Sequence, residues 1–406
     1  MSFDNLLVIS AAAALIPLLL GLAPRLPVPG PVAEISAGVV LGPAVLNVVR
    51  VDETVRAASL LGLGFLLFLA GLEIDVRQFR RTQARRAVDG LAITVALGLA
   101  AGFGLQALGL VKNPLLVGIA LMATSLGLVV PILKDAGMAD RPVGQLTIAG
   151  ASAAEVTAVV LLSVFFSDRR GALGGRLLLL ALLGLFATAV VLLVRGAERS
   201  MRLGDVINRL ADTTAQIRVR LAVLLLVGLA AIAANLGFEA ILGAFIAGAL
   251  LRVVDPDADR IHPKFRIKLE GIGFGFLIPV FFVTSGITFD LHQLTGHPAT
   301  LLRVPLFLAL LLVVRGVPAL LYRSSLTGRE TLAAALLQAS SLPVLVAATQ
   351  IGLAVGAITA ANAAALVATG LVSVLVYPVL ALNTLRGMSP PRRSEVDRIR
   401  DDVRAA

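Results

Sequence analysis

The sequence contains no cysteine and little charge. Only 15% of its 406 residues are Asp, Glu, Lys or Arg, whereas 58% are hydrophobic. The lack of cysteine excludes disulfides, thiol chemistry and iron–sulfur ligation. Soluble domains carry about a quarter charged residues, so this composition indicates a membrane protein. The first apolar run, residues 5–22, has no basic leader and is long enough to span, so it is expected to be a span and not a signal peptide.

Side chains for enzyme chemistry are also scarce. The three histidines, His262, His292 and His297, fall in loops and show no metal-ligand spacing. No nucleophile, metal cluster or pair of carboxylates stands within an apolar run. The sequence therefore predicts no enzyme and no cofactor.

Apolar runs of about 20 residues recur along the chain, the length that an α-helix needs to cross a bilayer. The predicted fold is all-α, with about thirteen transmembrane helices. The expected spans are residues 5–23, 31–49, 57–75, 88–110, 114–133, 142–166, 177–194, 219–236, 239–254, 270–287, 302–322, 330–351 and 358–384.

The basic residues predict one orientation. An external N-terminus places most of the 35 Lys and Arg in cytoplasmic segments, as the positive-inside rule requires. The two most basic inner loops contain Arg77, Arg80, Arg81, Arg85 and Arg86, and Arg252, Arg260, Lys264, Arg266 and Lys268. Topology thus explains most of the net charge of +10, and no nucleic-acid partner is expected.

Three short motifs recur in the same order, seven spans apart. Residues 34–38 (EISAG), 71–75 (GLEID) and 124–130 (TSLGLVV) are echoed by 239–243 (EAILG), 286–290 (GITFD) and 340–346 (SSLPVLV). An odd offset predicts two inverted six-helix repeats, which are typical of secondary transporters. The expected division is a first repeat at 1–166, a linker helix and cytoplasmic loop at 167–217, a second repeat at 218–384 and a cytoplasmic tail at 385–406.

The third pair of motifs also predicts two interrupted helices. Thr124, Ser125 and Gly127 lie within the fifth span, before Pro131. Ser340, Ser341 and Pro343 occupy the matching place in the twelfth. Glycine and proline weaken or remove helical hydrogen bonds, and such breaks persist in a membrane only where protein or water covers them. In a single span a proline kink would be the simpler interpretation, but a matched pair favours a binding site.

Glu155 is the acidic residue expected deepest in the membrane, near the middle of the sixth span. A charge at that depth costs at least about 2.5–3.5 kcal/mol by insertion scales, so such residues are rarely kept without a function. A carboxylate that binds either a proton or a cation couples the two fluxes. The sequence therefore predicts that Glu155 carries the proton and binds a transported monovalent cation; the alternative is a glutamate that only holds helices together.

Arg315 is the basic residue predicted at comparable depth. We expect it to pair with a carboxylate, with carbonyls of the broken helices, or with both. Because a buried arginine stays protonated, its expected role is structural and electrostatic.

The chain resembles the bacterial cation/proton antiporters, the branch with the sodium/proton exchangers and potassium-efflux antiporters. The resemblance covers nearly all of residues 30–385 and rests on residues 34–43 (EISAGVVLGP), 65–75 (FLLFLAGLEID), 243–248 (GAFIAG) and 279–282 (PVFF). It implies two crossed broken helices in a moving core domain, a dimerisation domain, alternating access, a homodimer and a bacterial inner membrane.

The resemblance also implies roles for single residues. Thr124 and Ser125 match broken-helix hydroxyls near the ion, Glu155 matches the essential second acid of a paired motif, and Arg315 matches a basic residue facing that acid. The chain departs from the family where it has Ala154-Glu155, because the family pairs an Asp, Asn or Gln with an Asp. A single acid predicts electroneutral exchange of one Na⁺ or K⁺ for one H⁺. The alternatives are a sodium- or proton-coupled symporter of a small organic anion and a transport-inactive membrane sensor.

Overall fold

The computed structural model describes residues 3–22, 28–73, 81–166, 173–198, 210, 213–254, 263–296 and 298–385. The expected tail after residue 385, the end of the 65–75 motif and much of the 167–217 segment lie outside these residues. Every regular element in the described ranges is a helix. Ten helices are long and apolar enough to cross a membrane, and three shorter apolar helices lie at Gly30–Leu41, Leu177–Val190 and Ala240–Val254. The all-helical membrane fold is confirmed, and the total of thirteen spans stays a prediction.

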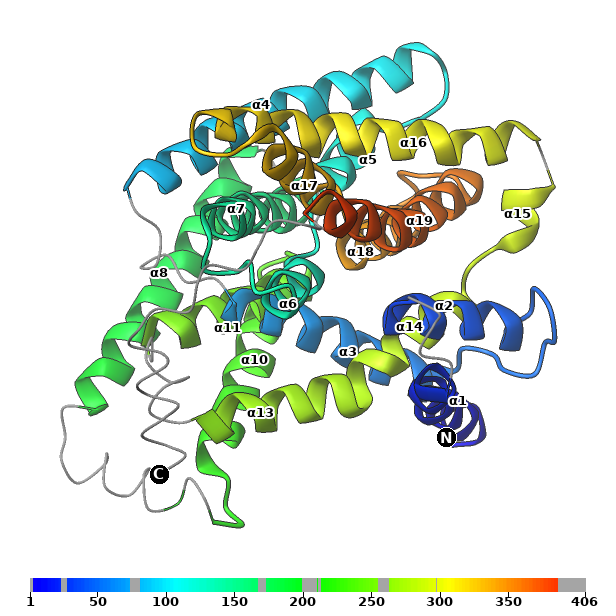
Figure 1. Ribbon diagram of the computed structural model, residues 1–406. Coiled ribbons are helices and arrows are strands. Elements are labelled where there is room, and N and C mark those ends of the chain that lie inside the picture. Colours follow the sequence, from blue (N-terminus) through cyan, green and yellow to red (C-terminus); the bar gives the residue numbers. More distant parts are fainter. Residues whose placement is uncertain are drawn as a thin grey trace, which may run out of the picture.

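The helices form two layers (Figure 1). The layer that we call the α3 layer contains α1 (Asp4–Leu22), α2 (Gly30–Leu41), α3 (Glu53–Leu72), α10 (Ile217–Asn235), α11 (Ala240–Val254), α13 (Pro263–Ile272) and α14 (Ile278–Ile287). The α7 layer contains α4 (Arg81–Ala107), α5 (Pro114–Met122), α6 (Leu126–Asp135), α7 (Pro142–Phe165), α16 (Pro298–Gly316), α17 (Gly328–Gln338), α18 (Pro343–Ala354) and α19 (Ala360–Leu385). Helix α8 (Leu173–Glu198) packs on α7 and α11, and the short α15 (Leu291–Thr295) leads into α16.

Local sequence explains several helix ends. Asp52 caps α3 by accepting a hydrogen bond from the backbone N–H of Val55 at 2.8 Å, and Asn5 donates to its other oxygen at 2.9 Å. These two bonds stabilise the carboxylate and hold the pKa of Asp52 below its usual range. Thr327 and Glu330 form a reciprocal capping box at the start of α17.

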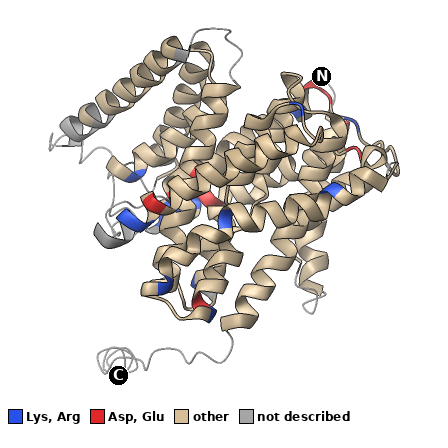
Figure 2. Cartoon of the chain, turned by 90° about the horizontal axis from the view of Figure 1, so that it is seen from above, with Lys and Arg blue, Asp and Glu red and all other residues tan. Residues whose placement is uncertain are grey.

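The second expected span, residues 31–49, is helical only as far as Leu41. Gly42 follows, and Pro43 disfavours helical backbone in the residue before it. The chain then turns, and Asn47 has a left-handed φ of 50°. Elsewhere the predicted spans and the helices agree to within a few residues at most ends. Figure 2 shows that the helices are uncharged over most of their length, as expected for segments in lipid.

Glycine lets backbones touch within the α3 layer. A Cβ atom on Gly38 of α2 would meet the carbonyl oxygen of Val283 in α14, and one on Gly42 would lie 2.9 Å from Ile287 Cα. Gly38 and Gly42, four residues apart, thus both pack directly against the backbone of α14. A Cβ atom on Gly248 of α11 would likewise meet the carbonyl oxygen of Phe68 in α3. Small residues permit such close contact between membrane helices.

Replacing Gly248 by alanine is therefore expected to destabilise the protein, by about 1–3 kcal/mol or more. The added methyl group meets backbone, so α11 and α3 must move apart. Gly228→Ala in α10 is the matched control, because nothing lies within 4 Å of its Cβ position. The difference is measured as thermal stability in detergent, with loss of the monodisperse peak on size-exclusion chromatography as the readout. Equal stability of the two variants would contradict the close packing.

Candidate ion-binding site

Two helices are interrupted at the same place in the α7 layer. Helix α5 ends at Met122 and α6 begins at Leu126, while α17 ends at Gln338 and α18 begins at Pro343. The two breaks touch, because the backbone N–H of Ser125 donates to the carbonyl oxygen of Ser340 at 2.9 Å. This bond satisfies one backbone donor that the break in α5–α6 frees. The predicted crossed, discontinuous helices are thus present.

Glu155 reaches this crossing from the middle of α7. Its side chain is buried, and its Oε2 atom accepts a hydrogen bond from the backbone N–H of Leu126 at 3.0 Å. Leu126 is the first residue of α6, so the carboxylate lies at a helix N-terminus, where the helix dipole favours negative charge. Glu155 forms no ion pair with a basic side chain in the described part of the chain. Among those residues it therefore has no fixed counter-ion.

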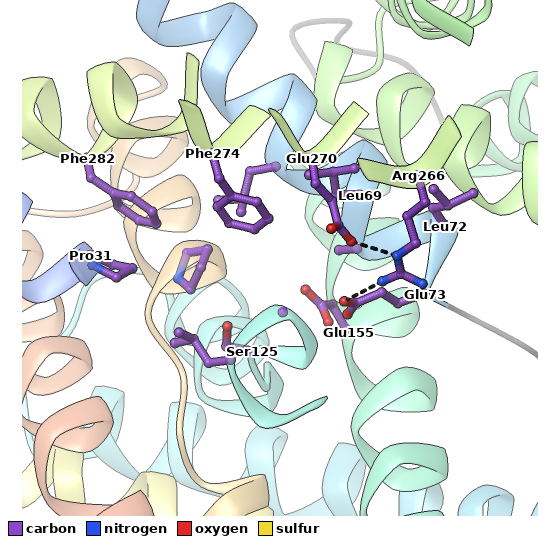
Figure 3. A pocket seen from close by; sticks show the side chains of 15 residues that line it. Pro31, Leu69, Leu72, Glu73, Ser125, Glu155, Arg266, Glu270, Phe274 and Phe282 are labelled. Atoms are coloured by element: carbon purple, nitrogen blue, oxygen red, sulfur yellow. Dashed lines mark hydrogen bonds and ion pairs between the residues drawn. The ribbon is translucent and has the colours of Figure 1, made fainter. Parts of the chain in front are cut away.

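Glu155 lines a cavity between the two layers (Figure 3). Among the residues predicted for the site, Glu155, Ser125 and Pro343 line the cavity. The remaining lining residues come mainly from α3, α13–α14 and the start of α6: Pro31, Leu66, Leu69, Ala70, Leu72, Glu73, Gly127, Leu128, Arg266, Glu270, Phe274 and Phe282. The wall is mostly apolar, so few other polar side chains compete with its charged groups for a bound ion.

Glu73 is a second carboxylate in the cavity that the sequence analysis did not single out. It follows the last residue of α3, and Figure 3 shows its side chain and that of Glu155 pointing into the same space. Arg266 Nη2 lies 3.3 Å from Glu73 Oε1. Glu73 Oε2 is buried and accepts no hydrogen bond from the residues that the structure describes. The signal that could have indicated Glu73 is its place in the motif 65–75, directly after a buried apolar segment.

Arg315 is buried and contacts both interrupted helices. Its guanidinium donates to the hydroxyls of Thr124 and Thr94, to the carbonyl of Gly150 and to the side-chain oxygen of Gln338, over 2.6, 3.0, 3.2 and 3.5 Å. Of the partners expected for it, a carboxylate is not found within the described residues. The expected link to the broken helices holds through Thr124 and Gln338, and the charge acts on Glu155 at longer range.

The other predicted residues maintain the breaks, Thr124 through its hydroxyl and Ser340 and Ser341 through their backbones. Thr124 Oγ1 donates to the carbonyl of Gln338 at 2.6 Å, so the arginine and the end of α17 occupy this hydroxyl. The backbone of Ser341 bonds in both directions with the hydroxyl of Ser373 in α19. Ser340 contributes its carbonyl to the contact with Ser125. Thr94, Gln338 and Ser373 were not predicted, although each is a polar residue within an apolar span.

The arrangement can bind a small cation or a proton. Carboxylate oxygens from α7 and α3, with Ser125 beside them, supply the hard oxygen ligands that alkali cations require. Such a group at crossed, broken helices is typical of ion-coupled secondary transporters.

The chain is a member of the sodium/hydrogen exchanger family, whose transmembrane region matches residues 10–382. It is 32% identical to the putative Na⁺/H⁺ antiporter YjbQ of Bacillus subtilis over 93% of this chain and 62% of that protein. The chain therefore spans less than two thirds of that relative. It is 28% identical to the Na⁺/H⁺-K⁺ antiporter GerN of Bacillus cereus over 66% of this chain and 67% of that one.

Solved structures support the same fold. The sodium proton antiporter MjNhaP1 from Methanocaldococcus jannaschii superposes with a TM-score of 0.64, covering 94% of this chain and 99% of that one at 19% identity. The family relationship and the fold are thus reached independently. Together they identify a multi-pass membrane protein of this family.

Proposed function

We propose that the protein exchanges a monovalent cation, Na⁺ or K⁺, for H⁺ across a bacterial plasma membrane by alternating access. The observation that carries the proposal is the buried Glu155 carboxylate, which lines a cavity at the crossing of two broken helices and has no basic partner among the described residues. The names of the relatives support the same chemistry, since they are described as Na⁺/H⁺ antiporters and, for GerN, as acting on K⁺ as well.

Competition at Glu155 couples the two ions. When the carboxyl group is protonated, it has no negative charge to offer a cation, and a bound cation in turn disfavours the proton. The N–H of Leu126 and the N-terminus of α6 stabilise the ionised form. Ser125 and Glu73 lie on the same cavity and are the nearest candidates to complete the coordination of the cation.

An external N-terminus determines which side of the membrane the cavity faces. Helix α3 then runs inward, so Glu73 at its C-terminal end and Arg266 near the start of α13 lie toward the cytoplasm. In this orientation the cavity is the cytoplasmic approach to Glu155. The outward-facing state then requires the α7 layer, which carries Glu155 and both breaks, to move against the α3 layer. The α3 layer is the proposed site of homodimer contacts.

We assign a single exchangeable proton to Glu155, which makes the exchange electroneutral. Arg315 remains protonated and Glu73 already faces the guanidinium of Arg266. One proton and one monovalent cation then alternate on Glu155, and no net charge crosses the membrane in a cycle. A turnover rate that changes with an imposed membrane potential would contradict this stoichiometry.

Reconstituted liposomes test the exchange and identify the cation. Purified protein is reconstituted with a pH-sensitive dye inside, and Na⁺, K⁺ or Li⁺ is added outside in turn. We expect at least one cation to drive proton efflux well above the rate in protein-free liposomes, with little response to an imposed potential of either sign. If no cation changed the dye signal between pH 6 and pH 9, the exchange would be refuted. The organic-anion symporter and the transport-inactive sensor would then be the functions to test.

A further inference from the structure

A hydrogen bond joins the two layers between α14 and α18, which face each other across the layer boundary (Figure 1). The side-chain amide of Gln350 in α18 donates from Nε2 to the hydroxyl oxygen of Ser285 in α14 at 3.4 Å. Ser285 is buried, and its hydroxyl donates in turn to the carbonyl oxygen of Phe281 at 2.8 Å. The hydroxyl of Ser285 thus gives its proton to its own helix and accepts a hydrogen bond from the opposite layer.

This contact lies directly beyond the end of the cavity. Phe282 in α14 and Pro343, the first residue of α18, both line the cavity, whereas Ser285 and Gln350 do not. Ser285 is about one turn further along α14 than Phe282, and Gln350 is about two turns further along α18 than Pro343. The two helices therefore run in the same direction here, and the hydrogen bond continues the faces that close the cavity.

The contact also lies close to the far ends of both helices. One turn beyond Ser285 and Gln350, the side chains of Thr288 and Leu353 are exposed, and α14 and α18 end there. With the N-terminus outside, these are the external ends of the two helices. The hydrogen bond thus lies between the cavity that contains Glu155 and the external surface.

We propose that Ser285 and Gln350 form the outer gate of the transporter, a hydrogen bond that is made while the cavity faces the cytoplasm and broken when it faces outside. The inference rests on the proposed function, because alternating access moves the α7 layer against the α3 layer, and the two residues belong to different layers. Movement of α18 relative to α14 separates the amide from the hydroxyl. Their oxygens then face the external path and can bind a partly dehydrated alkali cation on its way to or from Glu155.

Breaking the hydrogen bond by substitution is expected to raise the share of outward-facing molecules about two- to fivefold while that state is the minor one. A neutral hydrogen bond between membrane helices is weak, and a bond made in one state alone shifts the equilibrium by its whole contribution. Gln350→Ala and Ser285→Ala each remove the bond. Thr349→Val is the matched control, because the buried hydroxyl of Thr349 donates to the carbonyl of Val346 within α18.

The accessibility of a single introduced cysteine measures the outward-facing share, since the chain has no cysteine of its own. Ser125→Cys places a thiol on the cavity at the crossing of the broken helices. A membrane-impermeant maleimide is added to right-side-out and to everted membrane vesicles, and the labelling rates are compared. In Ser125→Cys alone we expect faster labelling in everted vesicles, because the cavity opens to the cytoplasm in the proposed orientation. Faster labelling in right-side-out vesicles would overturn the proposal.

Gln350→Ala and Ser285→Ala, each combined with Ser125→Cys, are expected to label from the outside two- to fivefold faster than Ser125→Cys alone. Thr349→Val is expected to leave the rate unchanged. The double variant Gln350→Ala/Ser285→Ala is expected to match either single variant, because all three lose the same bond. External labelling no faster than in the control would overturn the proposal. So would additive effects in the double variant, or an equal increase from both sides, which indicates a loosened fold.

Labelling does not depend on proton flux, so the gate and the proposed exchange can fail separately. If the labelling rates changed as expected in a protein that exchanges no cation for protons, the exchange would be refuted. Ser285 and Gln350 would then be the gate of a transporter for another solute. If the exchange were normal and external labelling did not respond to Gln350→Ala or Ser285→Ala, the gate would be refuted and the exchange would stand.

Discussion

Glu155→Gln is expected to reduce cation-driven proton flux to the rate of protein-free liposomes. Glutamine is nearly the same size and its side-chain oxygen can still accept the hydrogen bond from Leu126, but it neither titrates nor carries charge. Proton carriage and cation attraction are therefore lost together. The fold is expected to persist, because replacing a buried charge with a neutral group removes a desolvation penalty. Flux with a pH-sensitive dye and thermal stability in detergent are measured on the same preparation.

A matched control and the stability measurement separate loss of the titrating carboxyl group from loss of the fold. Glu53→Gln is the matched control, because Glu53 is an exposed acid in the first turn of α3 and does not line the cavity. It is expected to retain wild-type flux. If Glu155→Gln retained flux as well, the exchanged proton would have to be carried by another group, and Glu73 would be the next candidate. If it lost both flux and thermal stability, Glu155 would be a structural residue that holds α7 to the break.

Much of the fold follows from local sequence. The lengths of the apolar runs predict where helices cross the membrane, and the paired Ser, Gly and Pro residues of the fifth and twelfth spans predict the two breaks. Glu155 stands out because an acidic residue so far from a span end has no local explanation. Each of these features is determined by the sequence of one or two helices. Patterns of hydrophobicity and helix-breaking residues are informative over that range.

The composition of the cavity does not follow in this way. Glu73 looks like an ordinary residue at the end of a span, and it belongs to the site because α14 and α6 pack beside α3 and α13 brings Arg266 to it. The pairing of Arg266 with Glu270 follows from their i, i+4 spacing on one helix, but nothing in the local sequence predicts the contact of Arg266 with Glu73. That contact joins residues nearly 200 positions apart, and the arrangement of helices in three dimensions decides it.

The partners of Arg315 could not be predicted from the local sequence either. Its depth predicted a buried cation, but its partners are neutral hydroxyls, a carbonyl and an amide instead of a carboxylate. Those partners belong to α4, the α5–α6 break, α7 and α17. One side chain on α16 thus connects four other parts of the α7 layer, and it does so beside the break that positions Ser125 and Leu126. Its principal role in this arrangement is to hold the crossing together.

Arg315→Met is therefore expected to cause a large loss of thermal stability and, as a consequence, of transport. The substitution leaves acceptors on Thr124, Thr94, Gly150 and Gln338 without their donor, and an unsatisfied buried group costs about 1–3 kcal/mol. Neutral hydrogen bonds between membrane helices average only about 0.6 kcal/mol, but here the donor is charged and serves four acceptors at once. The loss of thermal stability is measured by size-exclusion chromatography of heated samples.

Arg315→Lys tests whether charge or geometry matters more. Lysine keeps the positive charge but has three donors on a single nitrogen, so it cannot bond Thr124 from one side and Gly150 from the other as the planar guanidinium does. It is expected to melt between the wild type and Arg315→Met. If Arg315→Lys were as stable as the wild type, the positive charge alone would suffice to hold the crossing. If Arg315→Met were stable but inactive, Arg315 would act on the ion and not on the fold, since its charge reaches Glu155 at longer range.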